Sequence, residues 1–123
     1  MRIIIAGSRT FNDYDLLKTK IDKFTRKLKT VVVLSGEANG ADRLGEKWAK
    51  ERGWQIERFP AEWEKHGRKA GIVRNLEMLE SIGKKGCLIV FWDGVSRGTA
   101  HIVEAAKTKG IKTKIVSFKK EFK

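Results

Sequence analysis

Hydrophobic and polar residues alternate along the chain in two patterns of different length. Short apolar or mixed runs occupy positions 3–6, 31–34, 55–59, 88–92 and 113–117. Between them lie four longer segments in which hydrophobic residues recur every three or four positions. The short runs predict strands, and three of them are continuously hydrophobic, as expected for strands covered by helices on both faces. Strands that alternate with helices predict an α/β protein with a parallel sheet.

The four predicted helices have apolar faces and identifiable ends. Asn12 and Asp13 are good N-caps for the first helix, the third is expected from about Ala70, and glycines end the second, third and fourth, namely Gly53, Gly83 and Gly110. The residues expected to face the core are, helix by helix, Leu17, Ile21, Phe24 and Leu28; Ala41, Leu44, Trp48 and Ala49; Ile72, Leu76 and Leu79; Ile102, Val103 and Ala106.

The strand order follows from the handedness of the connections. Right-handed crossovers allow a doubly wound, five-stranded parallel sheet of order 3-2-1-4-5, with the mixed third and fifth strands at the edges. The expected fold is a Rossmann-like three-layer sandwich formed by residues 1–123 as a single domain. The winding reverses between the first and fourth strands, and ligands of open α/β sheets bind at that reversal. We therefore expect the segments after Ala6 and Trp92 to form the walls of a crevice, with the turn after Leu34 alongside.

The turn after the first strand reads Gly7-Ser8-Arg9-Thr10. Glycine lets backbone amides approach a ligand closely, the serine hydroxyl can donate to a phosphate oxygen, and the planar fork of arginine matches phosphate. A tight turn with a solvated arginine explains the same residues equally well.

The turn after the second strand consists of small residues and leads into a helix N-terminus. Its candidate binding residues are Ser35, Gly36, Gly40 and Asp42. Unpaired amides and the positive end of the helix dipole make such a place receptive to anions. A carboxylate at position 42 would repel a phosphate. We therefore expect Asp42 to cap the helix, to pair with an arginine such as Arg9 or Arg74, or to accept a hydrogen bond from a ribose or base, and capping is preferred.

The turn after the fourth strand is again small and hydroxylated, and again opens a helix. As a site, it would hold phosphate with Ser96, Gly98 and Thr99, while Asp93 contacts sugar or base. The alternative is a plain turn, because Asp-Gly is a frequent turn sequence, and the Asp93 carboxylate would then only stabilise the loop. Because two such loops meet at one predicted switch point, the site interpretation is favoured.

Residues 63–75 are predicted to form a long polar loop that enters the third helix and could act as a flap over the crevice. Arg74 and Asn75 would supply polar contacts from the first helical turns, or Arg74 could tie the helix to Asp42 or Asp93. His66 and His101 lack the spacing of metal ligands, so no metal site is expected.

Charge and cysteine content narrow the class of protein. The formal charge of +12 comes from 27 Lys and Arg against 15 Asp and Glu and creates a field attractive to nucleic acid, phosphate or acidic partners. A solvated basic surface explains the charge as well, and it is preferred over a dedicated polyanion site until the geometry of the basic patch is known. Cys87, the single cysteine, lies in an apolar run and is expected to be a buried, reduced thiol. With no apolar stretch long enough for a membrane span and no signal peptide, the expected location is cytoplasmic.

Four motifs in this order resemble the SLOG superfamily, the Rossmann-like group of DprA/Smf and Lonely Guy proteins, and within it the small YspA/YpsA-related family of bacteria and phages. They are Gly7-Ser8-Arg9, Ser35-Gly36-x-Ala38-x-Gly40-Ala41-Asp42, Ala70-Gly71-x-x-Arg74-Asn75-x-x-Met78 and Phe91-Trp92-Asp93-Gly94-x-Ser96-x-Gly98-Thr99. The resemblance spans nearly the whole chain. It implies binding of a nucleotide or an ADP-ribose-like derivative, and a possible homodimer formed through helices beside the site.

The resemblance also implies two alternatives. DprA-like relatives bind single-stranded DNA, which agrees with the basic charge. Lonely Guy enzymes hydrolyse the bond between base and ribose phosphate with a glutamate one helical turn after a Gly-Thr pair. Here Ala100, His101 and Ile102 follow Thr99, so that glutamate is missing and only Asp93, Asp42 or Glu104 could replace it. We therefore prefer nucleotide binding, possibly as a sensor, over catalysis.

Overall fold

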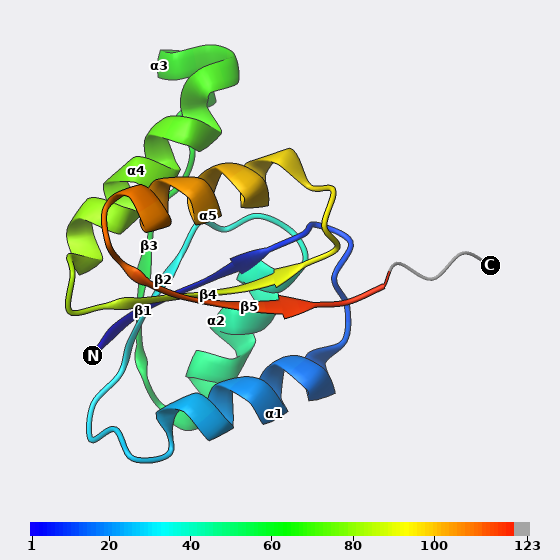
Figure 1. Ribbon diagram of the computed structural model, residues 1–123, viewed down its shortest axis with the longest axis vertical. Coiled ribbons are helices and arrows are strands. Elements are labelled where there is room, and N and C mark those ends of the chain that lie inside the picture. The colour runs from blue at the N-terminus through cyan, green and yellow to red at the C-terminus, as the bar shows by residue number, and fades with distance from the viewer. Residues whose placement is uncertain (120–123) are drawn as a thin grey trace.

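The sheet of the computed structural model, which describes residues 1–119, has five parallel strands in the order β3-β2-β1-β4-β5 (Figure 1). The strands are β1 (Arg2–Gly7), β2 (Val32–Ser35), β3 (Gln55–Arg58), β4 (Cys87–Trp92) and β5 (Lys112–Ser117). The doubly wound α/β fold and the strand order predicted from the sequence are confirmed. In the register of the central pair, Gly7 lies opposite Phe91, so the carboxyl ends of β1 and β4 are neighbours.

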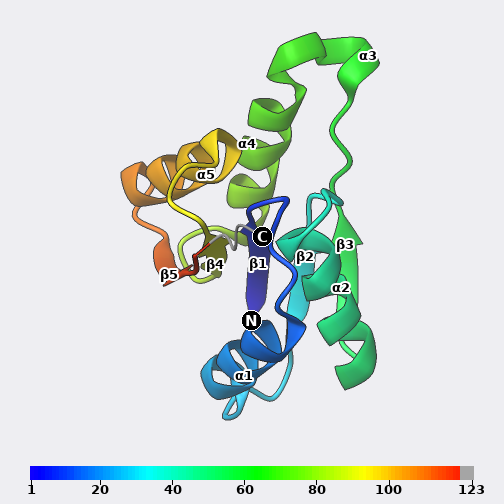
Figure 2. The same cartoon turned by 90° about the vertical axis from the view of Figure 1, so that its right-hand side faces the viewer.

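Helices cover both faces of the sheet. On one face lie α1 (Tyr14–Thr25) and α2 (Ala41–Arg52), and on the other α4 (Ala70–Ile82) and α5 (Arg97–Thr108), as Figures 1 and 2 show. The short α3 (Trp63–His66) and the 3₁₀ turn η1 (Gly67–Lys69) precede α4. The Asp13 carboxylate accepts a hydrogen bond from Leu16 N at 3.0 Å, which confirms the predicted N-cap of α1.

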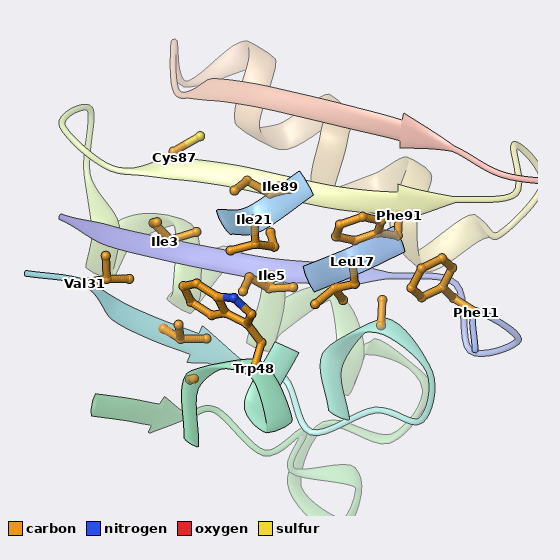
Figure 3. Close-up of a cluster of buried hydrophobic side chains, with 13 residues drawn as sticks. Ile3, Ile5, Phe11, Leu17, Ile21, Val31, Trp48, Cys87, Ile89 and Phe91 are labelled. Carbon is orange, nitrogen blue, oxygen red and sulfur yellow. The ribbon is translucent and has the colours of Figure 1, made fainter. Parts of the chain in front are cut away.

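Two hydrophobic clusters, one on each face, hold these layers together. Figure 3 shows the first, in which the Trp48 indole of α2 lies beside Ile5 of β1, with Leu17 of α1 close by. Trp48 is 1% exposed, and its indole N–H donates to Asp22 of α1 at 2.9 Å. A Cβ on Gly45 would lie 2.7 Å from Ile5, so glycine lets α2 pack closely on the strand. Cys87 is buried and free, as expected.

Three residues expected in the core are instead substantially exposed. Phe24 is 36% exposed because it lies at the margin of the α1 stripe, where its ring contacts the ammonium of Lys114 rather than the core. Leu28, predicted on the same helix, lies beyond its end at Thr25 and is half-buried. Ile72 and Leu76 are 45% and 38% exposed.

The buried face of α4 has a different phase from the predicted one. Its buried residues are Ala70, Asn75, Met78, Leu79 and Ile82, at helical spacing. The first turns of α4 extend beyond the sheet (Figures 1 and 2), so Ile72 and Leu76 have no strand to cover them, whereas Ala70 is still buried. The polar Asn75 occupies the inner face because that face looks onto the candidate site described below.

The segment predicted as a long polar loop is helical for much of its length. Residues 63–69 form α3 and η1, which continue directly into α4. Together they rise above the carboxyl ends of the strands (Figure 2). Within residues 1–119, no helix is long and apolar enough to cross a membrane, and no cluster of His, Cys, Asp or Glu could hold a metal ion.

Candidate functional site

A pocket of about 410 Å³ lies where the winding of the sheet reverses, at the carboxyl ends of β1 and β4. It is bounded by the turns after these two strands and by the first turns of α2, α4 and α5. The sequence-predicted residues that line it are Gly7, Ser8, Arg9, Asp42, Arg74, Asn75, Asp93, Ser96, Gly98 and Thr99. Most of the predicted residues are therefore brought together in one place.

The two walls of the pocket are joined through Ser8. Its backbone N–H donates to Phe91 O at 2.9 Å, and its hydroxyl accepts a hydrogen bond from Asp93 N at 3.1 Å. Gly7 is required beside it, because a Cβ there would lie 2.1 Å from Phe91 O and 2.9 Å from the Cβ of Ala41. The segments after β1 and β4 are thus locked together, as the topology predicted.

Asp42 forms the charged inner corner of the pocket. It is 4% exposed, and its carboxylate accepts from Ala38 N at 3.4 Å. Burial raises the pKa of Asp42 to about 6, although the charge of Arg74 and hydrogen bonds from the amides of Ala38 and Gly7 oppose that rise. The N-cap of α2 is Gly40, so Asp42 does not cap the helix. Its carboxylate forms no ion pair within 4.0 Å in residues 1–119, although the charge of Arg74 is close enough to act on its pKa.

Arg74 ties α4 to the turn after β2. Its guanidinium donates to Gly36 O at 2.5 Å and to the side-chain oxygen of Asn75 at 3.0 Å. A Cβ on Gly36 would lie 2.5 Å from that guanidinium, so only glycine admits this contact. Burial lowers the pKa of Arg74, the nearby charge of Asp42 raises it, and that of Arg9 lowers it again. Two guanidinium groups therefore repel each other at the pocket wall.

The N-terminus of α5 forms the opposite wall. Asp93 accepts hydrogen bonds from Val95 N and Ser96 N, both at 2.9 Å, which stabilises the turn that precedes the helix. The hydroxyls of Ser96 and Thr99 lie 3.1 Å apart and line the pocket. Ser96 occupies the N-cap position without a side-chain hydrogen bond to the first-turn amides. This wall therefore offers hydroxyl groups and the positive end of a helix dipole.

Positive charge at the pocket is only partly neutralised. Arg9, Arg68 and Arg74 line it. Arg9 and Arg68 form no ion pair or hydrogen bond with any residue in the range 1–119. By contrast, Arg2 and Arg52, elsewhere on the molecule, each pair with a carboxylate at 2.5 Å.

Four predicted residues lie outside this lining. The Ser35 hydroxyl donates to the buried carboxylate of Glu46 at 2.6 Å. Gly36 lines a neighbouring pocket instead, while Gly40, at φ +81°, lets the turn pass close to Ser8 O. Gly94 occupies an exposed turn at φ +87° with open space around it. These residues shape the site or stand beside it.

Other lining residues were not singled out by sequence reasoning. Trp63 and Arg68 lie within the predicted flap, and Ile72 was assigned to the core. The sequence signal that could have identified Trp63 and Arg68 is an aromatic residue close to basic residues within the predicted flap. Of the carboxylates that could replace the missing glutamate, Asp42 and Asp93 line the pocket, whereas Glu104 is exposed and does not. Ile102, at the position one turn after Gly98-Thr99, is 2% exposed at the pocket wall.

The fold and the site together define a doubly wound α/β protein with an arginine-lined pocket at its topological switch point. The chain belongs to the YspA, cpYpsA-related SLOG family (YAcAr), whose family model matches residues 1–66. It is similar to the gene 61 protein of Mycobacterium phage D29, with 37% identity over 116 residues that cover 89% of this chain and 91% of the phage protein. No solved structure matches the chain. The family expected from the four motifs is confirmed.

Proposed function

We propose that the protein binds a nucleotide, or a nucleotide-derived ligand that carries phosphate, in the pocket at the carboxyl ends of β1 and β4. The observation that carries the proposal is the pair of pocket-lining guanidinium groups, Arg9 and Arg68, that have no acidic partner within residues 1–119. An anionic ligand supplies the missing negative charge, and guanidinium recognises phosphate through paired hydrogen bonds. Membership of a SLOG family supports a nucleotide-related ligand.

The two sides of the pocket suit different parts of a nucleotide. The α5 side has the Ser96 and Thr99 hydroxyls, with Gly98 in open space, where backbone amides are accessible to phosphate oxygens. The opposite side has the Asp42 carboxylate, which repels phosphate and accepts hydrogen bonds from hydroxyl groups. The phosphate is therefore assigned to the α5 side, with Arg9 and Arg68, and the ribose or base to the side of Asp42 and Asn75.

Isothermal titration calorimetry with adenosine monophosphate (AMP) and ribose 5-phosphate tests the proposal directly. Loss of one charge-assisted hydrogen bond costs about 1.5–3 kcal/mol, so Arg9→Ala and Arg68→Ala should each weaken binding by roughly 10- to 100-fold. Arg26→Ala is the matched control, because it removes the same charge from an exposed position just after α1 that lines neither pocket.

Two results would contradict the proposal. One is the absence of binding by every nucleoside mono-, di- and triphosphate tested. The other is an equal loss of affinity in Arg26→Ala and Arg9→Ala, which would show that binding follows net charge rather than the pocket.

A further inference from the structure

A second pocket of about 270 Å³ adjoins the first, and we call it the second chamber. Its own walls include Glu37, Arg43, Pro60 and Ala61. It shares Arg9, Ala38, Trp63 and Arg74 with the main pocket. The two spaces therefore adjoin along these four residues.

The carboxylates beside the second chamber are already engaged by a different arginine. Glu46 is 4% exposed and interacts with the Arg58 guanidinium at 3.0 Å, while Glu37 lies 3.6 Å from the same group. Arg43 approaches Glu46 only at 3.9 Å, and its side chain is 54% exposed. Arg43 therefore keeps most of its positive charge available to an outside group.

Arg9 adds to this excess of positive charge. It lines both chambers and has no ion pair within residues 1–119. Burial is the main cause of the lowered pKa of Arg74, and the like charge of Arg9 lowers that pKa further. A group with negative charge between Arg9 and Arg43 would relieve that repulsion. The second chamber thus has the charge of an anion site, separate from the hydroxyl groups and helix N-terminus of the main pocket.

Trp63 stands where the two chambers meet. Its side chain is 54% exposed on α3, whereas Trp48 is buried in the core. An indole at the shared wall offers a flat apolar surface to whatever part of a ligand connects the two chambers. This arrangement favours a ligand with two charged ends over one with a single phosphate.

We propose that the second chamber is a second anion subsite, and that the ligand is a nucleotide with two phosphate groups, one held in each chamber. Arg43 binds the second phosphate, Arg9 lies between the two phosphates because it lines both chambers, and Trp63 contacts the part of the ligand that joins them. The proposal rests on the function proposed for the main pocket, because it extends the same ligand.

Titrations with AMP, adenosine diphosphate (ADP) and adenosine 3′,5′-bisphosphate at one ionic strength test this subsite. Adenosine 3′,5′-bisphosphate, whose two phosphates are separated by the ribose, should bind about 10-fold or more tightly than AMP, the effect of one added charge-assisted contact, whereas the adjacent phosphates of ADP cannot occupy both chambers. Arg43→Ala should remove most of that advantage, and Arg43→Lys should restore part of it. Lys50→Ala, which removes a charge from the exposed side of α2 outside both chambers, should leave the ratio of the affinities unchanged.

The outcomes separate the two proposals. If AMP binds but adenosine 3′,5′-bisphosphate binds no more tightly, or if its advantage survives in Arg43→Ala, the second subsite is wrong and the main pocket stands. If Lys50→Ala reduces the ratio of the affinities as much as Arg43→Ala does, the subsite is also wrong, because the tighter binding would then follow net charge. If none of the three nucleotides binds, both proposals fall.

Discussion

The buried carboxyl group of Asp42 should make the protein less stable as the pH rises through the weakly acidic range. Asp42 is 4% exposed, and burial raises its pKa from the ordinary 3.8 to about 6 in the folded protein. Between these two values the folded chain holds a proton that the unfolded chain has lost. Because the folded state then binds more protons than the unfolded state, raising the pH favours unfolding.

The magnitude follows from the two pKa values. One pKa unit corresponds to about 1.4 kcal/mol, so the full cost of ionising Asp42 in the folded state is about 3 kcal/mol. Between about pH 4 and about pH 7, ionisation of Asp42 should lower the free energy of unfolding by about 2–3 kcal/mol. The remainder of the full cost arises below about pH 4, where part of the titration lies. Arg74 offsets burial only partly, as its own pKa is lowered by burial and by Arg9.

Urea denaturation of the wild type and of Asp42→Asn at several pH values isolates this contribution. Asparagine keeps an oxygen that can accept from Ala38 N but does not titrate. Loss of the negative charge near Arg74 also changes the free energy of unfolding of Asp42→Asn by an amount that does not depend on pH. The test uses only the change with pH, so the sign of this constant difference does not matter. The difference in the free energy of unfolding, variant minus wild type, should increase by about 2–3 kcal/mol from about pH 4 to about pH 7.

Subtracting the wild type removes the pH dependence of the other carboxyl groups, such as Glu57, whose pKa is lowered by its hydrogen bond to Arg2. A difference that stays constant with pH would refute the reasoning. A difference that decreases would mean that Arg74 and the amide hydrogen bonds outweigh burial, and that the Asp42 carboxylate is stabilised in the fold.

The remaining predictions concern packing and charge. Gly7→Ala should lower the free energy of unfolding by about 3 kcal/mol or abolish folding, because its Cβ would lie 2.1 Å from a backbone oxygen. Gly98→Ala has open space around it in a helix, so it should raise the free energy of unfolding by up to about 1 kcal/mol while weakening phosphate binding. Thermal melts and ligand titrations of both variants test these two predictions. Trp48→Ala should cost about 3–5 kcal/mol in urea denaturation, since a fully buried indole leaves a cavity; a cost under about 1 kcal/mol would mean that the core closes around the gap. The net charge of +12 predicts that any binding of single-stranded DNA weakens by about 10³-fold or more between about 50 and about 200 mM salt, and no mobility shift at the lower concentration would exclude that function.

Much of the architecture could be predicted because it depends on local patterns. The continuous apolar runs at β1, β2 and β4 indicated central strands, and the mixed composition of β3 and β5 indicated edges. Once the strand order was inferred, the meeting of the Gly7 and Asp93 turns followed from the chirality of the crossovers alone. The structure confirms both the order and that meeting.

The errors arose where a residue's surroundings differ from what its own segment indicates. Ile72 and Leu76 have the spacing of a buried stripe, yet the first turns of α4 extend beyond the sheet and leave them exposed. Asn75 is buried instead because its face of the helix looks onto the pocket. Helical periodicity indicates which residues share a face, but it does not indicate how far that face overlaps the sheet.

The sequence by itself determined the strand order, the position of the crevice and the glycine-rich turns around it. It left open whether Asp42 caps its helix, whether Arg9 and Arg68 form ion pairs within residues 1–119, and whether a second chamber exists. Only the tertiary structure decided these, because they depend on distances between segments remote in the chain, such as Arg74 and Gly36, which are 38 positions apart. The hydrophobic pattern of a segment predicts its secondary structure because it depends only on residues within that segment. Ion pairs form between segments that are remote in the chain, so they are determined only when the segments pack.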